Sequence, residues 1–438
     1  MRASILRAAC QRVVLPAVCV TGLLVGCTAG EVELYEPEGS GLGQGLTVKV
    51  VLDSTAADIA EALRWTDGVP DAEVRVHRLG TEFRWQTALT DSAGEARFPD
   101  LIPGRYRLAA YRALTDDEAA QLGSRRRGFG DGLMLDIPGP STKTLALAPD
   151  RRGSLLIAEL YGTSPKKAEV QWNYHHYLEI YNNSETTVYL DGMILGRAYG
   201  WRFEYSSGLT CYESAPFRND PDGVWALYLH HFPGSGAEYP LAPGGIAVVA
   251  VDAIDHSQYH PSFPDLTQAD FELLGPADVD NPAVPNMPDI GLEYDRRGHG
   301  MIPWVGQTFL LSQAVDVETL PRATHEGWPL EFARFPREAL LDVLATERNH
   351  ALDEQSLPRC IESVHRNFDR LAGGFIKHGE DLEYSVQRLV IDTTPDGRAI
   401  LQDTNTSGVD LVRALYTVGT LPQPQLGGAG HAAGKREH

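Results

Sequence analysis

Three oxygen-bearing side chains stand close together in a proline-rich stretch and have the chemistry of calcium ligands. Asp278, Asp280 and Asn281 offer carboxylate and amide oxygens at alternating and adjacent positions, and Ca²⁺ takes oxygen ligands of this kind. The stretch lacks EF-hand spacing and has no glutamate at the expected distance, so a plain polar turn is the competing interpretation. We expect no cofactor, with calcium at this turn as the alternative.

Two pairs of histidines are the other candidates for metal binding. His175 and His176 are adjacent, and neighbouring residues on a strand point to opposite faces. His256 and His260 lie among prolines, where the helical geometry of an i, i+4 metal pair is not expected. We therefore predict no metal site at either pair.

A cluster of aromatic residues is the richest local feature of the sequence. Such side chains stack on sugar rings or form the centre of a protein-binding surface, and core packing is the competing use for about half of them. We predict that the exposed members bind a partner. The candidates are Trp172, Tyr174, Tyr199, Trp201 and Tyr205.

Motifs for nucleophilic or metal-assisted catalysis are absent from the sequence. There is no GxSxG elbow, no HExxH and no glycine-rich phosphate loop. The 59 acidic residues leave open a carboxylate pair of the kind that hydrolyses glycosides. We predict no catalytic residues and keep a hydrolase as the alternative.

The first residues have the pattern of an export signal. Arg2, Arg7 and Arg12 precede an apolar run, Val13 to Val25, whose length is typical of a signal-peptide core and too short to span a bilayer. The run ends in Leu-Val-Gly-Cys27, which resembles the lipobox of bacterial lipoproteins. That resemblance implies that residues 1–26 are removed and that Cys27 is lipidated, with 27–45 as a flexible acidic tether.

Charge and cysteine content narrow the partners and the compartment. Without residues 1–26 the chain has 38 − 3 = 35 basic and 59 acidic side chains, a net charge of 35 − 59 = −24. Such a surface repels phosphate backbones, which excludes nucleic acid as a partner. Cys211 and Cys360 would then remain in an oxidising compartment, as a disulfide or as two separately buried thiols.

Residues 46–150 predict a small β-sandwich. Thr47 to Leu52 and Glu73 to Leu79 alternate as strands. Thr90-Asp91, Gly94, Phe98 and Pro103-Gly104-Arg105-Tyr106 then combine turn residues with strand residues. This stretch resembles the carboxypeptidase regulatory-like domain, a transthyretin-like sandwich. The resemblance implies a non-catalytic module, and we predict an exposed loop from Ser124 to Asp131.

Residues 151–418 predict a second sandwich with insertions, and 419–438 predict a disordered tail. Short strands are expected at Ser154 to Gly162, Tyr177 to Asn183, Thr187 to Gly192 and Ile246 to Ala250. Together with the Leu-Glu-Ile-Tyr-Asn-Asn-Ser, Leu-Asp-Gly and Pro-Gly-Gly segments, and with Asp403 to Ser407, they resemble a lamin-tail-like immunoglobulin domain. More closely they resemble a bacterial lipoprotein family of unassigned function built on that plan.

The insertions and the polar strand residues carry further predictions. Helical spacing of apolar residues predicts a helix from Pro336 to Arg348, and a weak capping box at Thr267 predicts a helical turn before Leu274. We predict a structural hydrogen-bonding role for Glu179 and Asn182, since no base or nucleophile accompanies them.

The sequence as a whole predicts a mainly β, two-sandwich lipoprotein of the outer membrane, facing either the cell surface or the periplasm. Its predicted function is non-enzymatic binding of a protein or glycan through loops and aromatics of the second sandwich. A hydrolase acting on an envelope or nutrient polymer and a purely structural envelope component are the alternatives.

The lipid anchor gives a direct prediction. Replacing Cys27 with serine removes the acyl acceptor, so metabolic labelling with palmitate should be lost, whereas Cys10→Ser, within the predicted signal peptide, should leave labelling intact. Labelling that persists in the Cys27→Ser protein would refute the anchor.

Overall fold

The computed structural model describes a chain that is mainly β, as predicted. All its helices within the described segments are short, and none of them is long and apolar enough to cross a bilayer. The described residues are 45–79, 81, 85–125, 127–151, 155–163, 174–198, 217–273, 280–290, 302, 307–324, 331–348, 364–376 and 381–421.

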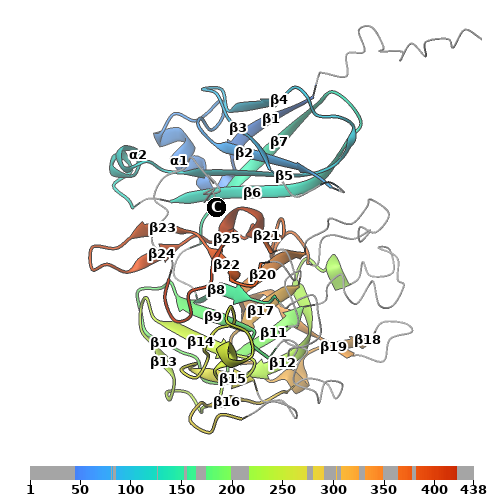
Figure 1. Cartoon of the computed structure of the whole chain (residues 1–438). Helices are drawn as coiled ribbons and strands as arrows, with labels where there is room; N and C mark the ends of the chain where they lie inside the picture. Colours follow the sequence, from blue (N-terminus) through green and yellow to red (C-terminus); the bar gives the residue numbers. More distant parts are fainter. Residues whose placement is uncertain are drawn as a thin grey trace, which may run out of the picture. The chain divides into compact units, whose positions relative to one another are not determined.

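The strands before residue 150 form one seven-stranded sheet of order β3-β2-β5-β6-β7-β1-β4 (Figure 1). Only two residue pairs join β6 to β7, so the sheet folds back on itself around a core that includes Val48, Val74, Leu108 and Phe129. The predicted sandwich is therefore present. Its strands are β1 (Leu46–Leu52), β2 (Glu73–Arg78), β3 (Gln86–Leu89), β4 (Glu95–Phe98), β5 (Gly104–Ala113), β6 (Gly128–Ile137) and β7 (Ser141–Pro149).

The predicted turn at Asp91 is built as its residue types require. The Asp91 carboxylate accepts hydrogen bonds from the backbone N–H groups of Ala93 and Glu95, and Gly94 takes a positive φ of 75°. The hydroxyl of Thr90 accepts from Ala72 N and donates to Val69 O, which ties this turn to the neighbouring one. Side-chain bonds of this kind explain why threonine and aspartate precede the turn.

Three features of this region differ from the prediction. Two helices, α1 (Ala57–Ala62) and α2 (Asp116–Gln121), lie between the strands, and α2 begins with a capping box formed by Thr115 and Glu118. The loop predicted from Ser124 to Asp131 is wrong in its second half, because β6 already begins at Gly128. Strand β6, which contains Gly128 and Gly130, pairs with β5 along ten residue pairs. Local composition does not reveal this long-range pairing.

Two more seven-stranded sheets follow, and they share a core that includes Leu178, Ile180, Leu195, Phe309 and Leu344 (Figure 1). The first has the order β16 (Asn286–Met287), β15 (Phe271–Leu273), β14 (Ile246–Ala250), β9 (Tyr177–Asn182), β8 (Leu155–Tyr161), β22 (Tyr384–Arg388) and β25 (Leu411–Leu415). The second has the order β18 (Arg322–Thr324), β19 (Glu331–Pro336), β12 (Gly223–His231), β11 (Ile194–Ala198), β17 (Thr308–Ser312), β20 (Leu340–Arg348) and β21 (Gly373–Ile376).

Small elements complete this part of the chain. The predicted strand near Thr187 is reduced to β10 (Val188–Tyr189), which pairs with β13 (Pro240–Leu241). A hairpin of β23 (Val390–Thr393) and β24 (Ala399–Leu401) precedes the one-turn helix α5 (Ser407–Asp410). The short 3₁₀ turns are η1 (Ser54–Ala56), η2 (His256–Gln258), η3 (Val317–Thr319) and η4 (Arg337–Ala339).

Both helices predicted in the insertions are wrong. Residues 340–348 form β20, which lies between β17 and β21 and is buried from Asp342 to Thr346, so a continuous apolar run mimics helical spacing. Residues 271–273 form β15, held between β14 and β16 in parallel pairing. In both places pairing with distant strands outweighs the local pattern.

The turn at Gly94 offers a stability test. A Cβ at this position would lie 2.7 Å from Gly68 Cα, Val50 O and Val69 N, at a positive φ. Gly94→Ala should therefore cost about 1–2 kcal/mol for the left-handed backbone and a further 1–3 for the overlap. Gly123→Ala is the matched control, because φ there is +59° and no atom lies within 4 Å. Urea unfolding should show a clearly larger loss for Gly94→Ala; equal losses would contradict the packing of this turn.

Candidate functional site

Most residues predicted to bind a partner lie outside the described residues. These are Trp172, Tyr199, Trp201 and Tyr205, as well as Cys27, Cys211, Cys360 and Asp278. Tyr174 is described and is half-buried just before β9. The aromatic surface, the disulfide and the lipidation site therefore stay predictions.

Asp280 and Asn281 lie in a turn that uses their side chains internally. Asp280 accepts a hydrogen bond from the Asn286 side chain at 2.7 Å. Asn281 accepts from Ala283 N and donates to Ala253 O. Among the described residues no group of three or more histidines, cysteines or acids is placed to hold a metal ion. These contacts favour the polar-turn interpretation for Asn281.

The histidine pair does not separate as predicted. The rings of His175 and His176 lie 4.7 Å apart, and the Nε2 atoms of both lie within 3 Å of the same carbonyl oxygen, that of Thr163. The prediction of opposite faces is wrong because β9 begins only at Tyr177. His175 stacks on Phe263, and burial lowers its pKa well below the ordinary value, so this ring acts as a core residue.

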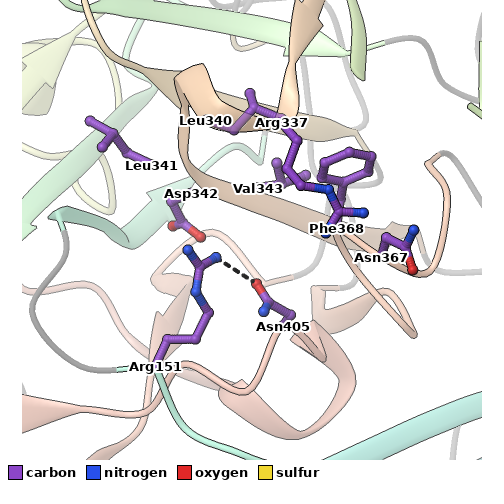
Figure 2. Close-up of a pocket in the computed structure, with 9 residues that line it drawn as sticks. All are labelled: Arg151, Arg337, Leu340, Leu341, Asp342, Val343, Asn367, Phe368 and Asn405. Atoms are coloured by element: carbon purple, nitrogen blue, oxygen red, sulfur yellow. Dashed lines mark hydrogen bonds between the residues drawn. The ribbon is translucent and has the colours of Figure 1, made fainter. Parts of the chain in front are cut away.

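An open pocket of about 290 Å³ lies beside β20 and is the strongest candidate for a binding site. Figure 2 shows side chains from several separate segments around it. Its volume is near the lower end of the ~300–1,000 Å³ range typical of small-ligand sites. The lining residues are Arg151, Arg337, Leu340, Leu341, Asp342, Val343, Asn367, Phe368 and Asn405.

Two exposed arginines supply the charge of the pocket. Arg151 donates to the side-chain oxygen of Asn405 at 3.2 Å, and Arg337 donates to Pro221 O at 2.8 Å (Figure 2 draws the first bond). The Arg337 guanidinium also lies 5.2 Å from the centre of the Phe368 ring, within the distance of a cation–π contact. In the described part of the chain neither guanidinium is paired with a carboxylate.

Two asparagines complete the polar wall. Asn405 has a φ of 54°, a left-handed conformation that asparagine tolerates better than most residues. Asn367 donates to Pro221 O, the same carbonyl that Arg337 contacts. Both carboxamides can donate and accept, so the pocket presents hydrogen-bonding groups of both kinds.

The acidic residue of the pocket, Asp342, is already neutralised from behind. Both of its oxygens lie 2.8 Å from Arg388 Nη2, and one accepts from Ile157 N. Arg388 is 2% exposed, and its Nη1 lies 3.4 Å from Asp403 and 3.8 Å from Asp410. Burial works to lower the pKa of Arg388, but the three carboxylates outweigh it and hold the pKa above its ordinary value.

Further buried acids surround this ion cluster. Burial raises the pKa of Asp403 to about 7 and that of Asp369 to about 8. Asp410 accepts hydrogen bonds from Thr404 and from the Gln402 side chain, and Asp369 contacts Ser407. These bonds hold the segment that carries Asn405 in place at the pocket wall.

A second hollow of about 240 Å³ provides a contrast. It is lined by Gly132, Leu133, Asn219, His365, Arg366 and Arg370. Here both arginines lie near Asp131, at 3.4 Å and 3.7 Å. Both arginines therefore have a carboxylate within 4 Å, whereas among the described residues Arg151 and Arg337 have none at that distance.

A buried pair of glutamates is the described arrangement closest to a catalytic acid pair. Glu159 and Glu179 are register partners on β8 and β9, and they are 2% and 0% exposed. Glu159 accepts from Tyr177 and Thr417, and Glu179 accepts from Gly419 N. Neither lines either pocket described above. These contacts agree with the structural role predicted for Glu179.

Sequence reasoning missed the pocket residues. Arg151, Arg337, Asn367 and Phe368 belong to no motif, and they come from three segments about 30 to 220 residues apart. The one signal was Asn405, which lies in the Asp403 to Ser407 segment that carried the resemblance to a lipoprotein family.

Comparison with known proteins gives structural likeness without a family. No family model matches the chain, and a search of curated proteins finds no match. A DUF4876 family protein from Bacteroides thetaiotaomicron VPI-5482 is 19% identical, with a TM-score of 0.48, over 86% of this chain and 98% of that one. A putative adhesin from Bacteroides ovatus ATCC 8483 is 12% identical, with a TM-score of 0.16, over 72% and 88%.

The glutamate pair predicts a pH dependence of stability. Burial, and then the charge of Glu159, raise the pKa of Glu179 well above its ordinary value. A carboxyl with a raised folded-state pKa stabilises fully below its unfolded pKa of about 4.3, and this stability is lost as pH rises toward the folded pKa. Across that window the loss is up to about 1.4 kcal/mol per pH unit.

Glu179→Gln should therefore remove this loss, because the neutral amide carries no charge to bury. The variant should gain stability relative to the unmodified protein between pH 5 and pH 8, measured as urea midpoints. Glu185→Gln, at an exposed turn position, is the control and should follow the unmodified protein. Parallel pH profiles for all three proteins would contradict the raised pKa of Glu179.

Proposed function

We propose that this protein is a lipid-anchored lipoprotein of the outer membrane that binds a glycan, without catalysis, in the pocket beside β20. The pocket supports this proposal, because it is concave and its lining includes two arginines and two asparagines. Buried hydrogen bonds to Asp410 and Asp369 hold the segment that carries Asn405. The pocket's two arginines have no carboxylate partner among the described residues, so a ligand can supply one.

The pocket fits a glycan ligand better than it fits a protein partner. The pocket is small, and its amide groups both donate and accept, as sugar hydroxyls do. Protein partners instead favour broad surfaces with aromatic anchors. The large described apolar side chains that are most exposed, such as Leu89, Tyr189 and Tyr259, belong to separate elements and are not part of the pocket.

Anchoring at Cys27 would keep this pocket near the membrane. A flexible tether, predicted from the sequence over residues 27–45, would span about 20–25 Å by random-coil statistics. The acidic mature chain would not adsorb to anionic headgroups, so the acyl group is the membrane contact in this proposal. Both the cell surface and the periplasmic face are compatible with it.

The described residues do not favour the hydrolase alternative. The pocket lining contains no serine, cysteine or histidine, and its one acid, Asp342, is committed to Arg388. The buried glutamate pair lines neither of the two pockets. A role as a structural component alone leaves unexplained why two arginines of the pocket form no ion pair with a described carboxylate.

A glycan array tests the proposal. The detergent-solubilised full-length lipoprotein should bind at least one class of glycan, and Asn367→Ala should weaken that binding by about tenfold, as expected for the loss of a polar contact. Asn219→Ala, an exposed asparagine in the second hollow, is the matched control and should bind normally. No glycan bound, or capture of an envelope protein that is insensitive to Asn367→Ala, would overturn the proposal.

A further inference from the structure

We infer that the pocket recognises sugars that carry a carboxylate, with Arg151 and Arg337 as the carboxylate-binding residues. This inference rests on the proposed function and names its ligand class. It follows from the charge balance of the pocket, the geometry of its donors and the state of the neighbouring acids.

The charge balance of the pocket favours an anionic ligand. Its lining contains two guanidiniums and one carboxylate, and that carboxylate is held by Arg388 through both oxygens. Elsewhere in the described structure, arginines such as Arg334 and Arg413 are paired with Asp220 and Asp381. In a chain with 21 more acidic than basic residues, two arginines in one pocket that form no ion pair with any described carboxylate favour an anionic ligand.

The two arginines approach the pocket from different sides. Figure 2 shows Arg151 and Asn405 on one side of the pocket, and Arg337, Phe368 and Asn367 on the other. A ligand between them meets a guanidinium from each side. A guanidinium binds a planar carboxylate through two parallel hydrogen bonds, and such charge-assisted bonds are roughly twice as strong as neutral ones.

Contacts with neighbouring residues position both arginines before a ligand binds. Phe368 is 5% exposed, and its ring centre lies 5.2 Å from the Arg337 guanidinium. Pro221 O accepts a hydrogen bond from Arg337 Nη2. Arg151 is fixed by Asn405 and by its own backbone N–H, which donates to Asp403 O. Phe368 and Asn405 are positioning residues in this arrangement. Preorganised donors lose less entropy on binding.

The amide groups of the pocket favour a sugar acid over a simple anion. Sulfate shares the charge and accepts hydrogen bonds from amide N–H groups, but it has no donor for the side-chain oxygen of Asn367. A sugar acid offers hydroxyls to these amides and a carboxylate to the arginines, and a single ring is of a size suited to a pocket of about 290 Å³.

Ligand-observed NMR titration with galacturonic acid and galactose tests the inference, because the two sugars differ only at C6. The full-length protein should bind the acid at least tenfold more tightly. Arg151→Gln and Arg337→Gln should each weaken binding of the acid by tenfold or more and change galactose binding by less than threefold. Arg97→Gln, an exposed arginine of the first sandwich, is the control and should change neither affinity.

The outcomes separate the inference from the proposed function. Equal affinity for both sugars, with binding still lost in Asn367→Ala, would overturn the carboxylate assignment and leave glycan binding standing. Competition by sulfate or phosphate at the same concentration as the sugar acid would overturn the assignment in favour of a general anion site. Absence of binding to every sugar tested and to the array would overturn both. Arg337→Lys, which keeps the charge but loses the planar fork, should retain part of the affinity, which guards against misfolding as the cause of a loss.

Discussion

The buried guanidinium of Arg388 is the interaction on which the second half of the structure depends. It lies on β22 and contacts Asp342 on β20, Asp403 and Asp410 in the α5 region, and carbonyl oxygens of Ile157 and Gln402. Burying one such ion without partners costs several kcal/mol. The cation and its carboxylates therefore have to be assembled together, and this requirement joins both sheets of the sandwich to the segment that follows the β23–β24 hairpin.

The candidate pocket is a consequence of this ion cluster. Asp342 faces Arg388 on its inner side and forms part of the pocket wall on the other. Asn405 follows Asp403 and is held by the hydrogen bonds around Asp410 and Asp369. Arg388 thus holds Asp342, the one acid of the pocket lining, which leaves the guanidiniums of Arg151 and Arg337 available to a ligand.

Much of the fold could be predicted from sequence, and the failures have a common cause. Strands such as β1, β2 and β9 show alternation or apolar runs with turn residues at their ends, and these features are local. From Asp342 to Thr346 both faces are buried, so the apolar pattern does not distinguish strand from helix, and pairing with β17 and β21 decides. The pocket was not predictable, because Arg151, Arg337 and Asn367 meet only through long-range packing and carry no shared spacing.

The coupling between Arg388 and Asp342 is the most direct test of this account. Urea unfolding of the Arg388→Met, Asp342→Leu and double variants gives the interaction free energy as a double-mutant cycle. We predict that Arg388→Met costs about 3–5 kcal/mol, because it leaves buried carboxylates without their cation. Asp342→Leu should cost less, because Asp403 and Asp410 remain beside Arg388, and the double variant should lose less than the sum of the two single changes. Losses that add to within about 0.5 kcal/mol would contradict it.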